Sequence, residues 1–327
     1  MPSVLISSAG RKVSLVRLFQ KAAGTYGWNV IVGDCDPLAP SVYMGDESVR
    51  LPRVNTPEYI PFLLEFARSH QVRLIVPSID GELLPLAENS DQFLTVGCRP
   101  LISAAEFVTI CRDKWATALR FSSCGVATPA SWLPATLNGH PLPEKLFIKP
   151  RDGSASIDAY SATRENMSRV LAMVPNPIIQ EQLHGTEITI DALIDFRGIV
   201  LHYVPRIRIR TMAGESIQGR TISDDSLREW LSACLEACAQ MGGRGVLTLQ
   251  AFLTAGGPIL TEVNPRFGGG FPLSYAAGAH YPQWILELLE NGQVPARLGE
   301  YRSDLYMSRY YQEHFFTAET LREPASS

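Results

Sequence analysis

Cysteine is sparse in this chain and is not arranged for chemistry. The 327 residues include six scattered cysteines, with no CxxC pair and no zinc-type spacing to histidine. This pattern predicts reduced, mostly buried thiols, as in a cytoplasmic protein. The six histidines lack readable serine or cysteine partners, so nucleophilic triad chemistry is not predicted.

An excess of charge and long apolar runs are also lacking. A formal net charge of −4 gives no overall attraction to nucleic acid or an anionic membrane, so any phosphate binding must be local. No apolar run approaches the length of a membrane span, and no signal-peptide core precedes Arg11 and Lys12. We therefore expect a cytoplasmic protein that binds small molecules, with neither nucleic acid nor membrane as partner. A homodimer is left open.

Two common nucleotide-binding motifs are absent. The P-loop pattern GxxxxGK[ST] does not occur, and Ser7–Gly10, after the first predicted strand, lacks GxGxxG. Ser7–Gly10 still precedes a predicted helix, which is a place where anions bind. Asp34 and Asp36 follow the second predicted strand and fit either a ligand contact or an ordinary turn.

Hydrophobic patterning predicts three lobes and a tail. Residues 1–104 alternate short apolar runs with helical patterns, as in a Rossmann-like α/β lobe with a parallel sheet. Residues 105–183 predict a small α+β lobe. Residues 184–317 are dominated by strand-like runs, which predict an antiparallel sheet with helices on one side. Residues 318–327 are expected to be a weakly patterned tail.

Individual elements can be placed within these lobes from apolar periodicity. In the first lobe, strands are expected at Val4–Ser7, Val30–Gly33, Leu74–Val76 and Leu94–Val96. In the second, helices are expected at Lys114–Ser123 and near Arg164–Met173, with strands at Leu146–Lys149 and Ile178–Gln182. In the third, strands are expected at Glu187–Ile194, Ile199–Pro205, Val246–Leu253 and Ile259–Asn264.

The strongest signal for chemistry lies in Val246–Asn264. A three-residue loop at Ala255–Gly257 would make a hairpin in which Gln250 lies opposite Glu262. Strand alternation puts Asn264 on the same face as Glu262. Magnesium prefers such hard oxygen ligands and keeps waters and nucleotide phosphates in its shell. The patch therefore fits a magnesium site, the alternative being an exposed polar sheet face.

Two glycine-containing loops could approach phosphate. Arg266 leads into the triplet Gly268–Gly270, whose bare backbone amides can reach a phosphate or carboxylate. Lys149 closes an apolar strand and precedes a loop with Gly153, Ser154 and Ser156, which together offer the donors that hold phosphates. Plain surface loops and a solvated lysine are the alternatives.

Two further segments fit ligand contacts less specifically. The extended run Ile178–Glu187 could present backbone groups to an adenine edge and a carboxylate to a ribose, although an ordinary strand and turn also fit. Arg206, Arg208 and Arg210 alternate along one predicted strand and should project from one face. Like charges there favour a bound anion, with a solvated edge strand as the alternative.

The order of these segments resembles the ATP-grasp superfamily, specifically single-module proteins similar to the carbamoyl-phosphate synthase large chain. The resemblance covers nearly the whole length and is carried by Val4–Arg11, Val76–Leu83, Asp113–Lys114, Gly125–Pro129 and Gln250 with Glu262–Phe267. One departure is the loop Gly153–Asp158, where relatives often carry another glycine. No second module follows, so carbamoyl-phosphate synthesis itself is not expected.

The resemblance implies a set of residue roles. Lys114 and Lys149, with Gly153, Ser154 and Ser156, would hold the nucleotide phosphates; Glu181 and Leu183 would present backbone to adenine, and Glu187 would bind the ribose. Gln250, Glu262 and Asn264 would bind Mg²⁺, with Mn²⁺ as an alternative. Arg266 would face the reacting group beside Lys149, and the substrate would meet Arg206, Arg208, Arg210, Gly268 and Gly269.

The expected activity is ATP-dependent ligation of a carboxylate and an amine through an acyl phosphate, with ADP and phosphate as products. A non-catalytic nucleotide-binding regulatory module of the same fold is the alternative. A nicotinamide-linked oxidoreductase is disfavoured because the glycine fingerprint is absent.

Overall fold

Strands with continuous apolar runs form the parallel sheet at the start of the chain. The structure is a computed structural model and describes residues 1–137, 139, 141–153, 157–212 and 215–317. The first sheet has the order β3-β2-β1-β4-β5. Its strands are β1 (Ser3–Ser7), β2 (Asn29–Asp34), β3 (Glu47–Arg50), β4 (Val72–Pro77) and β5 (Arg99–Pro100). All of β1 is buried, as expected for a central strand covered by helices on both faces.

The helices of this lobe explain one wrong prediction. They are α1 (Val13–Tyr26), α2 (Tyr59–Ser69), α3 (Leu83–Glu88) and α4 (Ser90–Thr95). Leu94–Val96, predicted as a strand, lies at the end of α4, and the strand itself follows as β5. A run of three residues is too short to separate the periods of a helix and a strand. The preceding residue, Phe93, is fully buried on the inner face of α4. Strand β3 had not been predicted.

The small lobe has its own sheet and core. Its four strands, in the order β6-β9-β7-β8, are antiparallel where they pair. The elements are α5 (Ala105–Arg112), α6 (Lys114–Ser123), β6 (Ser131–Trp132), β7 (Lys145–Pro150), β8 (Tyr160–Thr163), α7 (Met167–Leu171) and β9 (Pro177–Glu181). Helix α6 matches its predicted bounds, whereas α7 is shorter than predicted. The core of the sheet is formed by Leu146, Ile148, Ala162, Val170, Val174 and Ile179.

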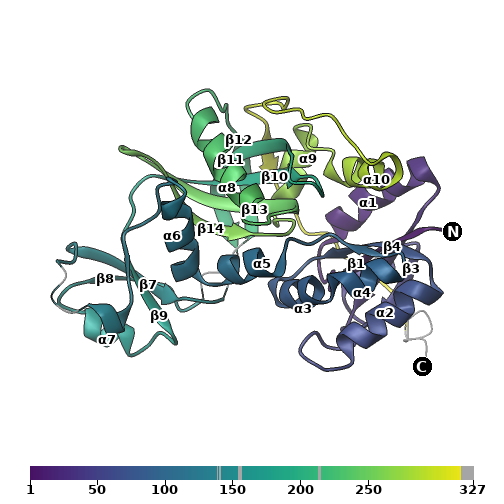
Figure 1. Cartoon of the computed structure of the whole chain (residues 1–327), viewed down its shortest axis with the longest axis horizontal. Coiled ribbons are helices and arrows are strands. Elements are labelled where there is room, and N and C mark those ends of the chain that lie inside the picture. Colours follow the sequence, from purple (N-terminus) through teal and green to yellow (C-terminus); the bar gives the residue numbers. More distant parts are fainter. Residues whose placement is uncertain (138, 140, 154–156, 213–214, 318–327) are drawn as a thin grey trace.

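The largest sheet carries the second half of the chain. Its order is β14-β13-β10-β11-β12-β15, and every pairing is antiparallel. The strands are β10 (Thr186–Ile194), β11 (Val200–Met212), β12 (Glu215–Thr221), β13 (Gly245–Thr254), β14 (Gly257–Asn264) and β15 (Tyr306–Ser308). The helices are α8 (Arg228–Gln240), α9 (Phe271–Ala276) and α10 (Tyr281–Asn291). This arrangement of one parallel and two antiparallel sheets confirms the predicted mixture of α/β and α+β lobes (Figure 1).

Helices cover both faces of the large sheet, and not one as predicted. Ile190 and Ala192 of β10 pack with α8, α5 and α6 in one core. Leu193 points to the opposite face and packs with α10 and with α1 of the first lobe in another core. Alternate residues of β10 therefore belong to two different cores. The part of the second face that α1 and α10 do not cover is available for a binding site.

The β13–β14 hairpin has a shorter turn than predicted. Thr254 pairs with Gly257, so the loop has two residues instead of three. A register shift between Gln250 and Ala251 inserts Thr261 as an extra residue, which is a β-bulge. Beyond this bulge Gln250 lies opposite Glu262, as predicted.

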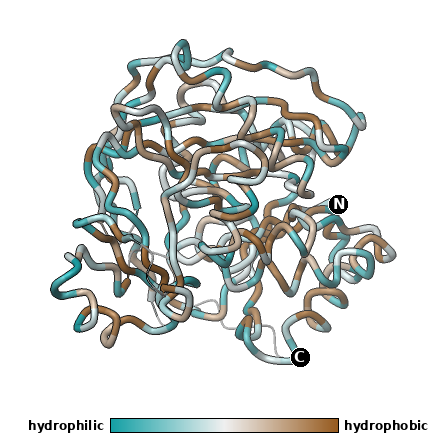
Figure 2. Tube along the Cα trace, turned by 60° about the vertical axis from the view of Figure 1, so that its left-hand side comes forward, coloured by the Kyte–Doolittle hydropathy of each residue, from teal (hydrophilic) through white to brown (hydrophobic). Residues whose placement is uncertain are grey.

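The first lobe and the large sheet share one hydrophobic core. Phe19 of α1 meets Phe267 edge to face at 5.8 Å, and Trp284 of α10 belongs to the same cluster. Figure 2 shows hydrophobic segments running through the interior of the molecule, with hydrophilic segments on the outer loops. No helix in the described ranges is long and apolar enough to cross a membrane.

Candidate functional site

A cavity of about 1070 Å³ is lined by residues of all three lobes. The small lobe contributes strand ends and loops around Lys149 and Gly153, the large sheet contributes β10, β11, β13 and β14, and the first lobe contributes Lys12 and Ser78–Gly81. The uncovered face of the large sheet therefore becomes the floor of a cleft. Most residues predicted for the site line this single cavity.

Two lysines stand at the small-lobe end. Lys114 is buried at the start of α6, and its ammonium donates to the Gly153 carbonyl at 2.8 Å. The Lys149 ammonium makes no hydrogen bond to a described residue and lies 5.8 Å from the Phe147 ring centroid. Burial lowers the pKa of Lys149 to about 8; Lys114 adds to this effect, while Glu262 and Glu187 oppose it. A nearby anion would therefore be bound strongly. Ser154 and Ser156 lie outside the described residues.

Some of the groups predicted to contact adenine and ribose already have partners within the protein. The Glu181 backbone N–H donates to the Ala130 carbonyl at 2.9 Å, so this N–H is not free for an adenine ring. The Leu183 N–H has no such partner among the described residues. Glu187 is ion-paired with Arg208 inside the cavity, so a ribose would have to share its carboxylate.

The three predicted metal ligands converge. Gln250 pairs with Glu262 across the hairpin, and the Asn264 side-chain amide donates to Glu262 Oε1 at 3.1 Å. Glu262 forms no ion pair with a described residue, although it lies near enough to Lys149 to raise that group's pKa. Arg208 donates to Gln250 Oε1 at 3.1 Å, so this oxygen is already partly used. Among the described residues, no group of three or more His, Cys, Asp or Glu side chains is placed to hold a metal ion.

The three arginines of β11 do not act as one row. Arg206 and Arg208 line the cavity, but the pairing of β11 with β12 shifts between Arg208 and Arg210. Arg210 is exposed and does not line the cavity among the described residues. The prediction that all three project from one face is therefore wrong, because the bulge breaks the alternation.

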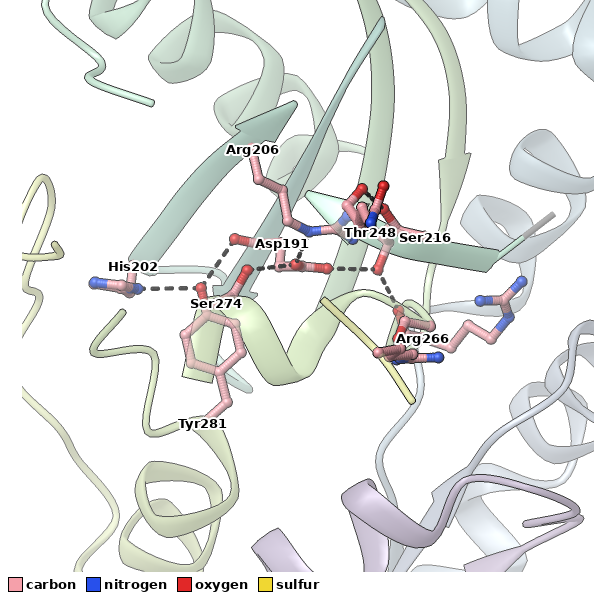
Figure 3. A network of polar contacts seen from close by, with 11 residues as sticks. Asp191, His202, Arg206, Ser216, Thr248, Arg266, Ser274 and Tyr281 are labelled. Carbon is pink, nitrogen blue, oxygen red and sulfur yellow. Dashed lines mark hydrogen bonds and ion pairs between the residues drawn. The ribbon is translucent and has the colours of Figure 1, made fainter. Parts of the chain in front are cut away.

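Arg206 is held by a buried network that the sequence did not reveal (Figure 3). Its Nε donates to Asp191 Oδ2 at 2.9 Å, and both side chains are almost completely buried. Ser274 donates to the same carboxylate at 2.6 Å, and Thr248 Oγ1 lies 3.3 Å from its other oxygen. Behind it, Tyr281 donates to the Asp191 carbonyl at 3.0 Å. These contacts fix the guanidinium at the cavity wall.

The glycine triplet is required by packing against these side chains. A Cβ at Gly270 would overlap the Arg206 guanidinium, and one at Gly268 would lie 2.8 Å from Thr248 Cγ2. A Cβ at Gly269 would lie 3.0 Å from Glu215. The triplet is thus a close backbone approach, with Gly268, Gly269 and Gly270 all lining the cavity.

Arg266 joins the large sheet to the first lobe. Its Nε and Nη2 donate to the two oxygens of Asp80, each at 2.7 Å. Such a bidentate pair fixes the guanidinium plane. Asp80 and the cavity-lining Lys12 were not predicted as site residues. The available signal was their position, since Asp80 lies within Val76–Leu83 and Lys12 directly follows Val4–Arg11, two segments that carried the family resemblance.

Two family models match the chain. One, described as PylC-like, N-terminal domain, matches residues 4–101. The other, described as ATP-grasp in the biosynthetic pathway with Ter operon, matches residues 173–311. The chain has the ATP-grasp fold. No curated protein matches the chain significantly.

Solved structures share this ATP-grasp fold at low sequence identity. The biotin carboxylase domain of Hydrogenobacter thermophilus 2-oxoglutarate carboxylase has a TM-score of 0.73 and 16% identity, covering 93% of this chain and 73% of that one. N5-carboxyaminoimidazole synthetase from Staphylococcus aureus gives 0.72 and 12%, covering 90% and 78%. L-amino acid ligase from Bacillus licheniformis gives 0.68 and 17%, covering 88% and 74%. These likenesses confirm the predicted fold.

Proposed function

We propose that this ATP-grasp protein is an ATP- and Mg²⁺-dependent ligase that joins a carboxylate to an amine through an acyl phosphate, releasing ADP and phosphate. The observation that carries the proposal is the single cavity in which Lys114 and Lys149 stand beside Gln250, Glu262 and Asn264. Cations for phosphate and oxygen ligands for a metal are what phosphoryl transfer requires. The similar structures are those of a carboxylase domain, a synthetase and an amino acid ligase, which agree with this class.

The donor set fits Mg²⁺ that arrives with a nucleotide. Glu262 supplies one carboxylate without an ion pair to a described residue, and Gln250 and Asn264 supply amide oxygens. One or two protein carboxylates completed by water and phosphate are typical of Mg²⁺ sites, whereas a stand-alone metal site would need more acidic ligands. When bound there, Mg²⁺ would offset charge on the phosphates.

The protein's own residues have distinct tasks in this proposal. Lys149 and Lys114 hold the phosphates, and the carboxylate substrate attacks the γ-phosphorus while ADP leaves. Arg206, fixed by Asp191, and the amides of Gly268–Gly270 face the acyl phosphate. The amine then attacks the acyl carbon, and phosphate departs with one oxygen from the original carboxylate. Exclusion of water from the cavity protects the acyl phosphate from hydrolysis.

An oxygen label tests this route. Amino acids and small acids are first screened in pairs for ADP release, with mass detection of the product. The active carboxylate is then supplied with ¹⁸O, and one labelled oxygen is expected in the released phosphate. AMP and pyrophosphate as products, or unlabelled phosphate during amide formation, would contradict the proposal.

The alternative is a nucleotide-binding module without turnover. It would bind MgATP by calorimetry but release no ADP with any carboxylate and amine pair. Lys149, which forms no ion pair with a described residue, serves either role, so turnover is the deciding measurement. The lobe boundaries at residues 104 and 183, a homodimer and a cytoplasmic location remain predictions of the same proposal.

A further inference from the structure

The end of the cavity that meets the first lobe lies at a position where open parallel sheets bind ligands. In the order β3-β2-β1-β4-β5, the chain leaves β1 towards β2 on one side, and β4 lies on the other. Ligands of such sheets bind outside the carboxyl ends of the strands at this reversal of order. Ser78 and Asp80, just beyond β4, and Lys12, just beyond β1, line the cavity there.

A buried carboxylate holds this edge in shape. Glu82 is fully buried and accepts hydrogen bonds from Tyr59 Oη at 2.5 Å, Ser8 Oγ at 3.1 Å and the backbone N–H groups of Ser78 at 2.6 Å and Ile79 at 3.1 Å. These contacts tie the loop after β1 to the loop after β4. Because its oxygens already accept these four donors, Glu82 fixes the two loops to each other and does not bind a ligand.

The other acidic groups near Lys12 are paired with arginines. Asp80 binds Arg266 in a bidentate pair, and Glu215 binds Arg309 at 2.9 Å. The Lys12 ammonium hydrogen-bonds no described residue, although its side chain is mostly buried in the cavity wall. Burial and the nearby Arg266 lower the pKa of Lys12 to about 8, while Glu82, Glu215 and Asp80 oppose the shift. A mostly buried cation without a bonded counter-charge favours an anion beside it.

Helix α1 begins at the same place, and no described side chain caps its first backbone N–H groups. It follows Lys12 directly and has no acidic residue in its first turn. The first backbone N–H groups of a helix lack internal partners and attract anions. The neighbours that shift the pKa of Lys12 differ from those of Lys149, which are Glu262, Lys114 and Glu187. The two lysines therefore serve different parts of the cavity.

We infer that Lys12 and the first turn of α1 form a subsite for an anionic group of the substrate, a carboxylate or a phosphate, apart from the nucleotide phosphates. The assignment of this group to a substrate rests on the proposed ligase function. It names the substrate class as small molecules that carry a negative group in addition to the reacting carboxylate or amine.

Competitive labelling of lysine tests the subsite without any turnover. The whole protein is acylated with a trace of amine-reactive reagent, and the extent at each lysine is read by mass spectrometry. Inorganic phosphate and malonate are added in separate arms, and MgADP in a third. Lys12 is expected to lose reactivity severalfold with phosphate, malonate or both. The exposed Lys21 and Lys145 serve as matched controls and should be unchanged. MgADP should protect Lys149 and leave Lys12 reactive.

Each outcome decides something. Protection by phosphate alone identifies a phosphorylated substrate, and protection by malonate alone identifies a dicarboxylate. Equal reactivity of Lys12 in all arms, or loss of reactivity shared by Lys21 and Lys145, overturns the subsite. Calorimetry with the protecting anion should show roughly tenfold weaker binding for Lys12→Gln and retention for Lys12→Arg, with MgADP affinity unchanged in both. ADP release without protection of Lys12 would overturn the subsite and leave the ligase proposal standing. Protection of Lys12 without ADP release would support the subsite and contradict the ligase proposal.

Discussion

Asp191 is a single residue on which both stability and site geometry depend. Its ion pair with Arg206 is almost completely buried, so Asp191→Asn would leave a buried guanidinium without its counter-charge. We expect a loss of about 3–5 kcal/mol in the free energy of unfolding, measured in urea. Asp304→Asn is the matched control, because the Asp304–Arg220 pair is exposed and should change stability by less than about 1 kcal/mol. Equal effects of the two variants would contradict the role given to Asp191.

His202 makes stability depend on pH. Its ring is completely buried, Nε2–H donates to the Glu300 carbonyl at 3.1 Å, and burial lowers its pKa to about 4. In the unfolded chain the pKa returns to about 6.5, so the unfolded state binds a proton first as the pH falls. Stability is therefore complete above about pH 6.5 and declines towards pH 4, with a loss of about 2 kcal/mol at pH 5 from this group.

The measurement is a pair of urea titrations at about pH 7.5 and pH 5 for the wild type and His202→Gln. The variant should be less stable at both values but should lose less stability between them. His280, whose pKa is also lowered by burial, is present in both proteins and cancels in the comparison. The same decline in both proteins would show that His202 does not carry the effect.

Glu262 is the carboxylate that the proposed metal site needs. Glu262→Gln removes its charge at nearly constant shape, so we expect ADP release to fall on the order of a hundredfold or more, with the fold intact. The control is Glu65→Gln, an exposed residue of α2 remote from the cavity. ADP release at the wild-type rate under limiting Mg²⁺ would remove Glu262 from the metal site.

Sequence reasoning found the site residues that local periodicity determines. Lys149 ends an apolar strand, and Glu262 and Asn264 stand two residues apart, so their placement needed no distant contact. Asp191 and Asp80 were missed because their roles come from Arg206 and Arg266. Asp80 and Arg266 are 186 residues apart in the chain. Such pairings depend on how lobes are assembled, which periodicity does not encode.

At the scale of elements, the β13–β14 hairpin shows two deviations that cancel. The turn is one residue shorter than predicted, which alone would have placed Thr261 opposite Gln250. The bulge adds one residue and returns Glu262 to that place. The sequence could therefore predict the facing pair without predicting either the turn or the bulge.

The small lobe should lose structure separately from the rest. Ile148 is fully buried in a core built from the small lobe alone, so Ile148→Ala should cost about 2–5 kcal/mol there. Hydrogen exchange should speed up in β7 and β9 while β10 keeps its protection. Ile190→Ala, in the core beneath the large sheet, is the matched control and should give the opposite pattern. Equal loss of protection in β7 and β10 for Ile148→Ala would contradict a separate small-lobe core.

At the scale of the whole molecule, the first lobe and the large sheet should unfold together. Phe19→Ala removes a buried ring that contacts Phe267, at a cost of about 3–5 kcal/mol. Because the cluster spans both lobes, slow-exchanging amides of β1 and α10 should lose protection by the same amount. Loss of protection in β1 with α10 unchanged would show that the shared cluster does not couple them.

Lobe types were predictable over the whole chain, but their mutual packing was not. Each lobe has its own apolar period and its own strand lengths, which the sequence displays directly. The shared core depends on the meeting of α1 and α10, whose buried faces are separated by most of the chain. The cover that α9 and α10 give to the second face of the large sheet was missed for the same reason.

The shared core also determines which parts of this protein can be exchanged with relatives. In a recombinant chain, the first lobe could come from another protein of the ATP-grasp fold. Its α1 would then have to pack against Phe267 and Trp284 as Phe19 does, or a cavity would form between the first lobe and the large sheet. The small-lobe sheet β6–β9 has no such constraint, because its core contains residues of that sheet and α7 but none of the large sheet. Crossover points on either side of β6–β9 should therefore yield folded hybrids far more often than a crossover between α4 and α5. Under the proposed function, in which the small lobe holds the nucleotide, exchange of this sheet would change nucleotide preference more readily than substrate preference.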